Sequence, residues 1–328
     1  MRGGGHRDQT MKYVGIPALV VCAIVVLVLW ITNADREAQP VRIGFLNIAA
    51  SLPLFIAEEN DYFSAEGVDI KTYSISSSNQ LVDGILAGNL DMFVEASAVP
   101  VFAATLRLAG AQKIFAVSSI TSEKPFDTIL VRSQSPIQGL ADLEGTSVGV
   151  FPGSTATNLL RKFLEDRGID VGGMSFVPIP PQSQLAALLE GSIAALHAYE
   201  PTTAIALSNG EARILHGSVY AEMLEPNPQG VAVVSSRFAS EYPEKAASAI
   251  RALERAMDFM RENDAASRTI LVSRLELSEA AADAMVFLYM VGHEDVSETT
   301  LQNYADMLTG LGELPASLDV SEMIYTGD

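Results

Sequence analysis

Cysteine and histidine are scarce in this sequence of 328 residues, which holds one cysteine and four histidines. A single cysteine, Cys22, excludes a disulfide framework and a zinc site built from several thiolates. The histidines, at positions 6, 197, 216 and 293, have no mutual spacing that suits a shared metal ion. No phosphate-binding loop or dinucleotide fingerprint is present either. We therefore expect no metal and no cofactor.

Basic residues are also few, with 21 Lys and Arg against 40 Asp and Glu, a net charge of −19. This balance argues against a nucleic-acid partner, whose phosphates need a basic face, and against charge-driven binding to an anionic membrane. It suits a highly soluble body outside the cytoplasm. The length favours two domains, each large enough to bury a hydrophobic core without disulfide or metal cross-links.

The longest apolar run is Tyr13–Thr32, 20 residues without a charge. Such a run is about long enough to cross a bilayer, and three basic residues before it place the N-terminus in the cytoplasm. The run is longer than the core of a usual signal peptide, which favours a retained anchor. Cleavage near Ala34, with secretion of the rest, stays open. Either way, the remaining chain lies on the periplasmic or extracellular face of the plasma membrane.

Apolar strands alternate with amphipathic helices along most of the chain, beginning with a strand at Val41–Leu46 and a helix at Leu52–Ala65. This rhythm predicts a mostly parallel sheet with helices on both faces. After a turn-rich break at Ser133–Asp142, a second series starts at Ser147–Phe151. A second break at Glu225–Gln229 precedes a further strand and an alanine-rich helical tail.

The simplest topology has a second lobe inserted into a first one, with two crossover strands between them. We expect a cytoplasmic stub with a membrane anchor or signal at 1–34, a linker at 35–40, a first lobe of 41–131 plus 230–328, and a second lobe of 132–229.

Polar residues follow several predicted strands of the first lobe. Ligands of open α/β sheets bind beyond the carboxyl ends of the strands, where helix N-termini offer free N–H groups. Candidate ligand contacts there are Asn47, Ser51, Asn79, Glu95 and Ser97. Glu95 stands out because a buried carboxylate needs a partner. Ordinary helix caps or a solvated rim would explain the same residues without a ligand.

The second lobe offers two comparable turns. In the first, Gly153 allows close approach of the backbone, and Ser154 and Thr155 can cap a helix or donate to a bound oxygen. In the second, Tyr199 gives a flat face with a polar tip and Glu200 an acceptor. Plain capping, or a buried tyrosine beside a rim glutamate, is the alternative.

No catalytic constellation emerges, because isolated histidines and serines do not make a triad without geometry. His197 lies in the middle of a predicted strand, where a packed side chain is expected rather than a base. We therefore expect no catalytic residue and no enzymatic activity.

Four segments together resemble the nitrate/sulfonate/taurine-type solute-binding proteins of ABC importers, relatives of the thiamine-pyrimidine synthase-like family. In order, they read VRIGFLNIAASLPLFIAEENDYFSAEGVDI, LVDGILAGNLDMFVEASAVP, GLADLEGTSVGVFPGSTATNLLRKFLEDRGID and LLEGSIAALHAYEP. The resemblance covers about residues 41–265. It implies a periplasmic-binding-protein type II-like fold: two α/β lobes with a two-strand hinge, here preceded by one N-terminal transmembrane helix. A solute would bind between the lobes of a monomer, and the closed form would dock on a membrane permease.

The resemblance carries the candidate residues named above into one cleft. Family members often have tryptophan where Tyr199 stands, so stacking would be weaker here. Hydroxyl-rich helix starts suit an anion, but Glu95 and Glu200 would repel one. We therefore expect a small polar solute with hydrogen-bond donors rather than bare nitrate: a sulfonate, an amino-containing zwitterion or a pyrimidine-like compound.

Two other functions stay open. A membrane-anchored clamp could serve as a ligand sensor or as an accessory subunit that presents its solute to a partner other than an importer. A pyrimidine-synthase-like enzyme is the other alternative, but the cysteine-rich motif and active-site histidine of those relatives are not evident in this sequence.

Overall fold

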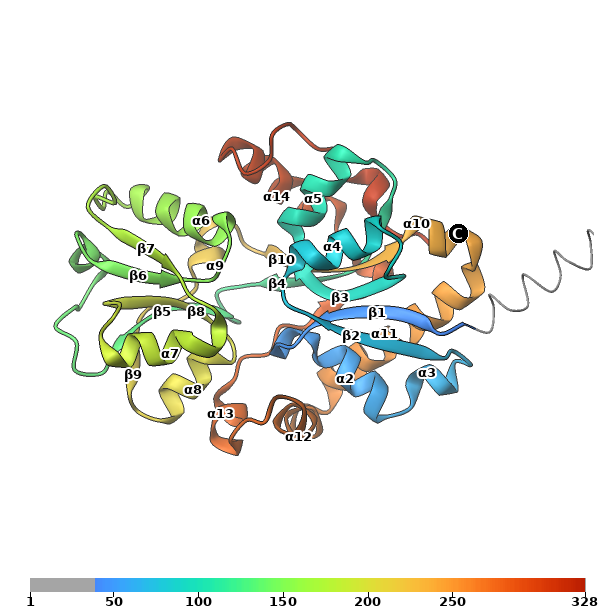
Figure 1. Ribbon diagram of the computed structural model, residues 1–328, viewed down its shortest axis with the longest axis horizontal. Helices are drawn as coiled ribbons and strands as arrows, with labels where there is room; N and C mark the ends of the chain where they lie inside the picture. The colour runs from blue at the N-terminus through green and yellow to red at the C-terminus, as the bar shows by residue number, and fades with distance from the viewer. Residues whose placement is uncertain (1–38, 328) are drawn as a thin grey trace, which may run out of the picture. The chain divides into compact units, whose positions relative to one another are not determined.

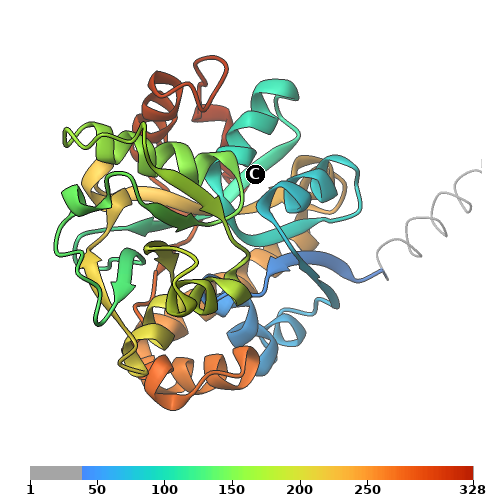
Figure 2. The ribbon, with the colours of Figure 1, turned by 60° about the vertical axis from the view of Figure 1, so that its left-hand side comes forward.

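Two β-sheets, each with helices on both faces, organise residues 39–327, the part of the chain that a computed structural model describes (Figures 1 and 2). The predicted anchor or signal at 1–34 lies outside the described residues. Within 39–327, no helix combines the length and apolar character needed to cross a membrane.

The first sheet has six strands in the order β11-β4-β10-β3-β1-β2. β1 is parallel to both β2 and β3, whereas β10 is antiparallel to β3 and β4. The strands are β1 Val41–Leu46, β2 Ile70–Ile75, β3 Met92–Ser97, β4 Gln112–Ile120, β10 Asn227–Ser235 and β11 Met290–Val291.

Helices cover both faces of this sheet, with α4, α5 and α14 on one face and α2, α3, α11 and α12 on the other (Figure 1). The longest, α11, buries an alanine-rich stripe against α2 and α3, because small side chains at helical spacing allow close packing. The helices are α2 Leu52–Glu59, α3 Tyr62–Ala65, α4 Ser78–Leu86, α5 Ala98–Arg107, α10 Ser236–Glu241, α11 Pro243–Glu262, α12 Asp264–Leu275, α13 Glu279–Ala284 and α14 Glu298–Gly310.

The second sheet has five strands in the order β7-β6-β8-β5-β9. β6 is parallel to β7 and β8, and β5 is antiparallel to both β8 and β9. Helices α6 and α9 lie on one side and α7 and α8 on the other (Figure 1). The elements are β5 Asp127–Arg132, β6 Ser147–Val150, α6 Ser154–Glu165, β7 Ser175–Pro178, α7 Pro181–Glu190, β8 Ala195–Tyr199, α8 Thr202–Ser208, β9 Ala212–His216 and α9 Val219–Met223.

The second lobe is an insertion in the first, since strands from before and after it share one sheet. The chain leaves the first sheet after β4 and enters the second at β5. It returns after β9 through α9 into β10. In each sheet, one strand next to a crossover, β10 or β5, lies antiparallel between two others.

Sheet pairing corrects the sequence interpretation at both crossovers. Residues 127–131 were expected in the first lobe, but β5 pairs on both sides with strands of the second sheet. Residues 227–229 were expected in the second lobe, but Asn227 opposes Ile120 in the first sheet. An apolar β-branched run predicts a strand but not its neighbours, so neither assignment followed from the pattern. The second crossover also contains a helix, α9, where only a strand was expected.

Polar contacts hold the two crossovers together. Ser122, between β4 and β5, donates from its backbone N–H and its hydroxyl to the Glu225 carboxylate, just before β10. Asp127, fully buried at the start of β5, accepts from the hydroxyl of Ser218 and from the first backbone N–H groups of α9. The crossovers therefore form one joint rather than two independent linkers.

Candidate functional site

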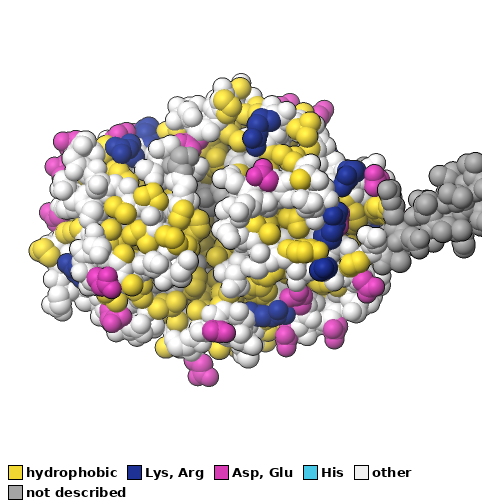
Figure 3. Space-filling view, viewed as in Figure 1, with side chains coloured by type: hydrophobic (Ala, Val, Ile, Leu, Met, Phe, Trp, Pro, Cys, Tyr) yellow, Lys and Arg dark blue, Asp and Glu magenta, His cyan; other side chains and the backbone are white. Residues whose placement is uncertain are grey.

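A pocket of about 140 Å³ lies where the carboxyl ends of the parallel strands of both sheets face each other. Figure 3 shows the groove between the two halves, with hydrophobic side chains along its walls. The pocket is smaller than the roughly 300–1,000 Å³ typical of drug-sized ligands, so it suits a small solute. Its lining residues are Leu46, Ile48, Ala50, Ser78, Glu95, Ala96, Ser97, Phe126, Phe151, Pro181, Gln184, Tyr199, Glu200, Pro201, Thr202, Gln229 and Leu288.

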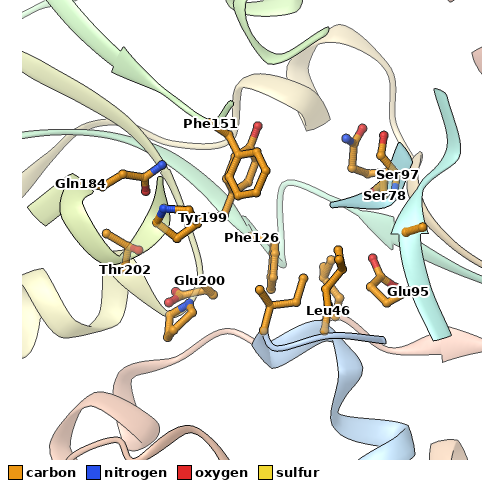
Figure 4. A pocket seen from close by; sticks show the side chains of 17 residues that line it. Leu46, Ser78, Glu95, Ser97, Phe126, Phe151, Gln184, Tyr199, Glu200 and Thr202 are labelled. Carbon is orange, nitrogen blue, oxygen red and sulfur yellow. Dashed lines mark hydrogen bonds between the residues drawn. The ribbon is translucent and has the colours of Figure 1, made fainter. Parts of the chain in front are cut away.

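Both lobes contribute polar groups to this pocket. In Figure 4, Gln184, Tyr199 and Thr202 of the second lobe lie across from Ser78 and Ser97 of the first. Apolar and aromatic side chains form most of the remaining wall. Among the described residues that line the pocket there is no lysine, arginine or histidine.

Glu95 reaches the pocket through a β-bulge in β3. The pairing of β3 with β10 shifts register between Val231 and Val233, and Glu95 has a φ of 58°. Residues other than glycine rarely adopt this left-handed conformation, which costs about 1–3 kcal/mol. Bulges of this kind redirect a side chain next to functional sites. Gly230 on β10 leaves the space that the redirected carboxyl group fills.

The Glu95 carboxyl group is buried without a cation among the residues that line the pocket. Its residue is 7% exposed, and its hydrogen-bond donor is the Ser118 hydroxyl on β4, at 3.2 and 3.0 Å from the two carboxyl oxygens. Burial raises the pKa of Glu95 to about 8, and the Ser118 hydrogen bond only partly opposes this. At neutral pH the Glu95 carboxyl group is therefore mostly protonated.

Glu200 is the second acid of the pocket, but its carboxylate is already used by the protein. It accepts from the backbone N–H of Ala204 at 3.0 Å, in the first turn of α8. It also accepts from the backbone N–H of Val286, in the segment that leads from α13 back to the first sheet. Burial raises its pKa to about 7, and these two bonds oppose the rise. Glu200 thus ties the second lobe to the first.

Tyr199 presents its ring to the pocket and its hydroxyl to the crossover. The hydroxyl lies 2.6 Å from that of Tyr220 on α9, and burial raises the pKa of both phenols. The ring packs edge-on against Phe151, with centroids 5.6 Å apart. Tyr199 therefore connects the pocket wall, through a hydrogen bond, to α9 in the crossover between the lobes.

Gln229 and the two serines complete the polar wall of the first lobe. The Gln229 carbonyl oxygen accepts from the buried Tyr304 hydroxyl of α14 at 2.7 Å. Ser78 accepts from the backbone N–H of Ser97 at 3.0 Å, whereas the Ser97 side chain makes no cap bond to α5. The amide nitrogen of Gln229 and the hydroxyl of Ser97 are thus candidate donors to a solute.

The structure brings four of the ten sequence-predicted residues to the pocket: Glu95, Ser97, Tyr199 and Glu200. The other five whose side chains are described do not line it. Ser51 is buried and donates to the carbonyl of Leu46 at 2.7 Å, and Asn47, Asn79, Gly153 and Thr155 lie outside the lining. The side chain of Ser154 falls outside what the structure describes. A ligand role for these ten residues stays a prediction.

Several lining residues have no counterpart in the sequence prediction, notably Gln229, Gln184 and Leu288. Gln229 lies near the amino end of β10, not after the carboxyl end of a strand. Because β10 is antiparallel, its amino end meets the carboxyl ends of β1 and β3. Strand direction would have revealed Gln229, but it is not readable from one sequence.

The buried polar cluster beside the pocket does not form a catalytic arrangement. His197 is fully buried, and its Nε2 lies 2.9 Å from the Asp127 carboxylate. Ser218 bonds to the same carboxylate rather than to the histidine, so no nucleophile faces a base. Within residues 39–327, no cluster of His, Cys, Asp and Glu could hold a metal ion.

Solved structures similar to this one include binding proteins and an enzyme. The alkanesulfonate-binding protein SsuA from Xanthomonas axonopodis pv. citri, solved with MOPS, gives a TM-score of 0.72 at 20% identity, covering 88% of this chain and 99% of that one. The periplasmic aliphatic sulphonate binding protein SsuA from Escherichia coli gives 0.71 at 18% identity, covering 88% and 92%. The desulfurization enzyme DSZB gives 0.65 at 17% identity, covering 87% and 96%. These likenesses establish the two-lobed fold of periplasmic binding proteins and no activity.

Sequence comparison finds a relative in Escherichia coli strain K12 that is named for binding aliphatic sulfonates. It is 25% identical over 185 residues, and the match spans 56% of this chain and 56% of the relative. The model of the NMT1-like family matches residues 34–275, well over half of the chain. The match runs through both lobes and includes Glu95, Tyr199 and Glu200 at the pocket. The chain belongs to the NMT1-like family.

Proposed function

We propose that this protein is the extracytoplasmic solute-binding component of an ABC importer, which captures a small polar solute between its lobes. The observation that carries the proposal is a pocket that both lobes line at the carboxyl ends of their parallel strands. Relatives named for binding sulfonates support the transport class. The permease partner follows from the class alone.

Capture would proceed by hinge closure. Contacts that join the lobes include Glu200 with the Val286 N–H, Asn158 of α6 with Glu313 after α14, and the packing of α13 on α8. A solute that touches both walls binds only the closed state fully, so it shifts the population toward closure. The joint formed by Ser122 and Glu225 is the natural pivot, because it links both crossovers.

The solute itself is constrained by the wall chemistry. We propose a compound that donates hydrogen bonds, such as an amino-bearing sulfonate, another zwitterion or an amino-substituted pyrimidine. The absence of a lysine, arginine or histidine among the described lining residues disfavours a bare anion such as nitrate.

A thermal-shift screen of the full chain, purified in mild detergent, tests the proposal. The panel contains sulfonates, amino acids, polyamines and pyrimidines. A compound at 100 times its dissociation constant adds about 2.7 kcal/mol, which raises the melting temperature by several degrees. Small-angle scattering should show a smaller radius of gyration with the same compound. If none of the compounds in the panel raises the melting temperature, the proposal is contradicted.

Turnover of the bound compound would instead favour an enzyme, as the likeness to DSZB allows. Mass spectrometry of the solute after incubation distinguishes the two. Among the described residues there is no cysteine to act as a nucleophile.

A further inference from the structure

The two acidic residues that line the pocket, Glu95 and Glu200, differ in the hydrogen bonds that the protein donates to them. Glu200 accepts two backbone N–H groups, one from each lobe, so much of its capacity is already used by the protein. Glu95 has one hydroxyl donor, Ser118, shared between both of its oxygens. A carboxylate can accept about four hydrogen bonds, so Glu95 retains unused capacity on the pocket side.

The protein also holds Glu95 in place at a cost. The carboxyl group sits on a bulge with a left-handed backbone, and it fills a space that exists only because residue 230 is glycine. Strained backbone of this kind persists where the surroundings impose it, most often at ligand sites. The arrangement places Glu95 in the wall of the pocket.

No neighbouring element supplies a cation to this group. Across the pocket, the titratable groups are Tyr199 and Glu200. On β1, Arg42 lies at the opposite end of the strand and is paired with Asp91. On β4, Lys113 lies near the opposite end from Ser118 and donates to the carbonyl of Glu322.

The other elements that pack around Glu95 also provide no cation to its carboxyl group. β10 carries no titratable side chain, and α4 and α5 contribute only Asp83, which is exposed, and Arg107, in the last turn of α5. Tyr304 of α14 is directed to Gln229. A charge on Glu95 is therefore balanced either by a proton or by the solute.

We propose that Glu95 is the counter-charge of a cationic N–H group on the solute, and that it gives up its proton when the solute binds. The inference rests on the proposed function. In the empty pocket the carboxyl group keeps its proton, which agrees with its raised pKa. When an ammonium or amidinium group enters, the carboxylate form is stabilised by the new ion pair and the proton leaves to solvent. The aromatic rings of Phe126, Phe151 and Tyr199 favour the same class of solute.

Three probes built on the same propyl chain test this: 3-aminopropane-1-sulfonate, propane-1-sulfonate and propylamine. We expect the two amines to bind and the plain sulfonate to bind at least tenfold more weakly. Calorimetry in buffers of different ionisation enthalpy should show release of about one proton at pH 7 with the amines. Their affinity should rise about tenfold between pH 6 and pH 7.

Two isosteric variants separate the roles of the acids. Glu95→Gln should weaken both amines at least tenfold and abolish proton release and pH dependence. Glu200→Gln should weaken all bound probes by a similar factor, because it loosens closure, while proton release persists. Equal loss of proton release in both variants would overturn the assignment to Glu95.

A measurement without solute keeps the test independent of ligand choice. In protein labelled with carbon-13 at the glutamate carboxyl carbons, the signal absent in Glu95→Gln should titrate near pH 8. Titration near pH 4.5 would overturn the inference, as would proton uptake on binding, which would make Glu95 a donor to an anion. If panel compounds bind but amines do not, the inference fails and the proposed function stands. If nothing binds, the proposed function fails and the titration still decides the state of Glu95.

Discussion

The Glu95 carboxyl group lies where a side chain on Gly230 would begin: a Cβ at residue 230 would stand 1.8 Å from Glu95 Oε1 and 2.2 Å from Ser118 Oγ. The shape of the pocket wall on β3 therefore depends partly on a residue of β10. Two strands that are 135 residues apart in the sequence must meet without a side chain between them.

Gly230→Ala should displace Glu95 and lower both stability and binding. The added methyl group has no room, and overpacking of a buried site costs about 1–3 kcal/mol. Urea denaturation measures the stability, and calorimetry with 3-aminopropane-1-sulfonate measures the binding. Gly217→Ala is the matched control, because a Cβ there meets nothing within 4 Å. Equal behaviour of the two variants would show that the Glu95 position is not set by Gly230.

Stability of the solute-free protein should fall as pH rises from 5 to 8. A carboxyl group with a pKa raised above its unfolded value binds more protons when folded, so its contribution is complete below about pH 4.5. That contribution is lost as the pH rises through about 7 for Glu200 and about 8 for Glu95. Each group contributes a slope of up to about 1.4 kcal/mol per pH unit.

Glu95→Gln isolates one of these two slopes. Chemical denaturation at several pH values should show a variant whose stability depends less on pH than that of the wild type, with the gap in its favour widening toward pH 8. Parallel curves for variant and wild type would mean that Glu95 ionises normally in the folded protein.

The hydroxyl pair of Tyr199 and Tyr220 should show strong non-additivity. Either single change to phenylalanine leaves one buried hydroxyl without its partner at 2.6 Å, at a cost of about 1–3 kcal/mol. The double variant removes both groups and should recover most of that loss. Urea unfolding of all four proteins gives the coupling energy. Additive losses would indicate that solvent replaces the missing partner.

Removal of the contact between Asn158 and Glu313 should weaken solute binding without touching the pocket. Neither residue lines the pocket, and their hydrogen bond joins α6 to the segment after α14. A partly exposed bond of this kind contributes about 1 kcal/mol or less, so Asn158→Ala should raise the dissociation constant up to about fivefold. Asn209→Ala, at the end of α8, is a control remote from this contact. Unchanged affinity would show that this contact does not stabilise the closed state.

Much of the fold followed from local pattern, because apolar β-branched runs and glycine-terminated helices are local properties. The strand predicted at Val41–Leu46 is β1, with the same bounds. The predicted helix at 52–65 is instead broken at Asp61, whose φ is 55°. Sheet membership was wrong for β5, because partners are chosen by contacts across the whole domain.

The candidate site was predicted where one rule applied and not elsewhere. Residues at the ends of parallel strands, such as Glu95 and Tyr199, reach the pocket as the strand-end rule requires. Ser51 lies in such a turn, but its hydroxyl donates to the backbone carbonyl of Leu46. Leu288 and Phe126 come from a tail segment and a crossover, where no periodic signal marks a binding surface.

The exchange of strands between the sheets has a consequence for biosynthesis. β4 contacts β3 only through β10, which is made after the entire second lobe. Until residue 235 has emerged, the first sheet has two separate fragments with unpaired edges, whereas the second sheet is complete once β9 has been made. The strands of the inserted lobe can therefore all pair before the first sheet has received its central strand.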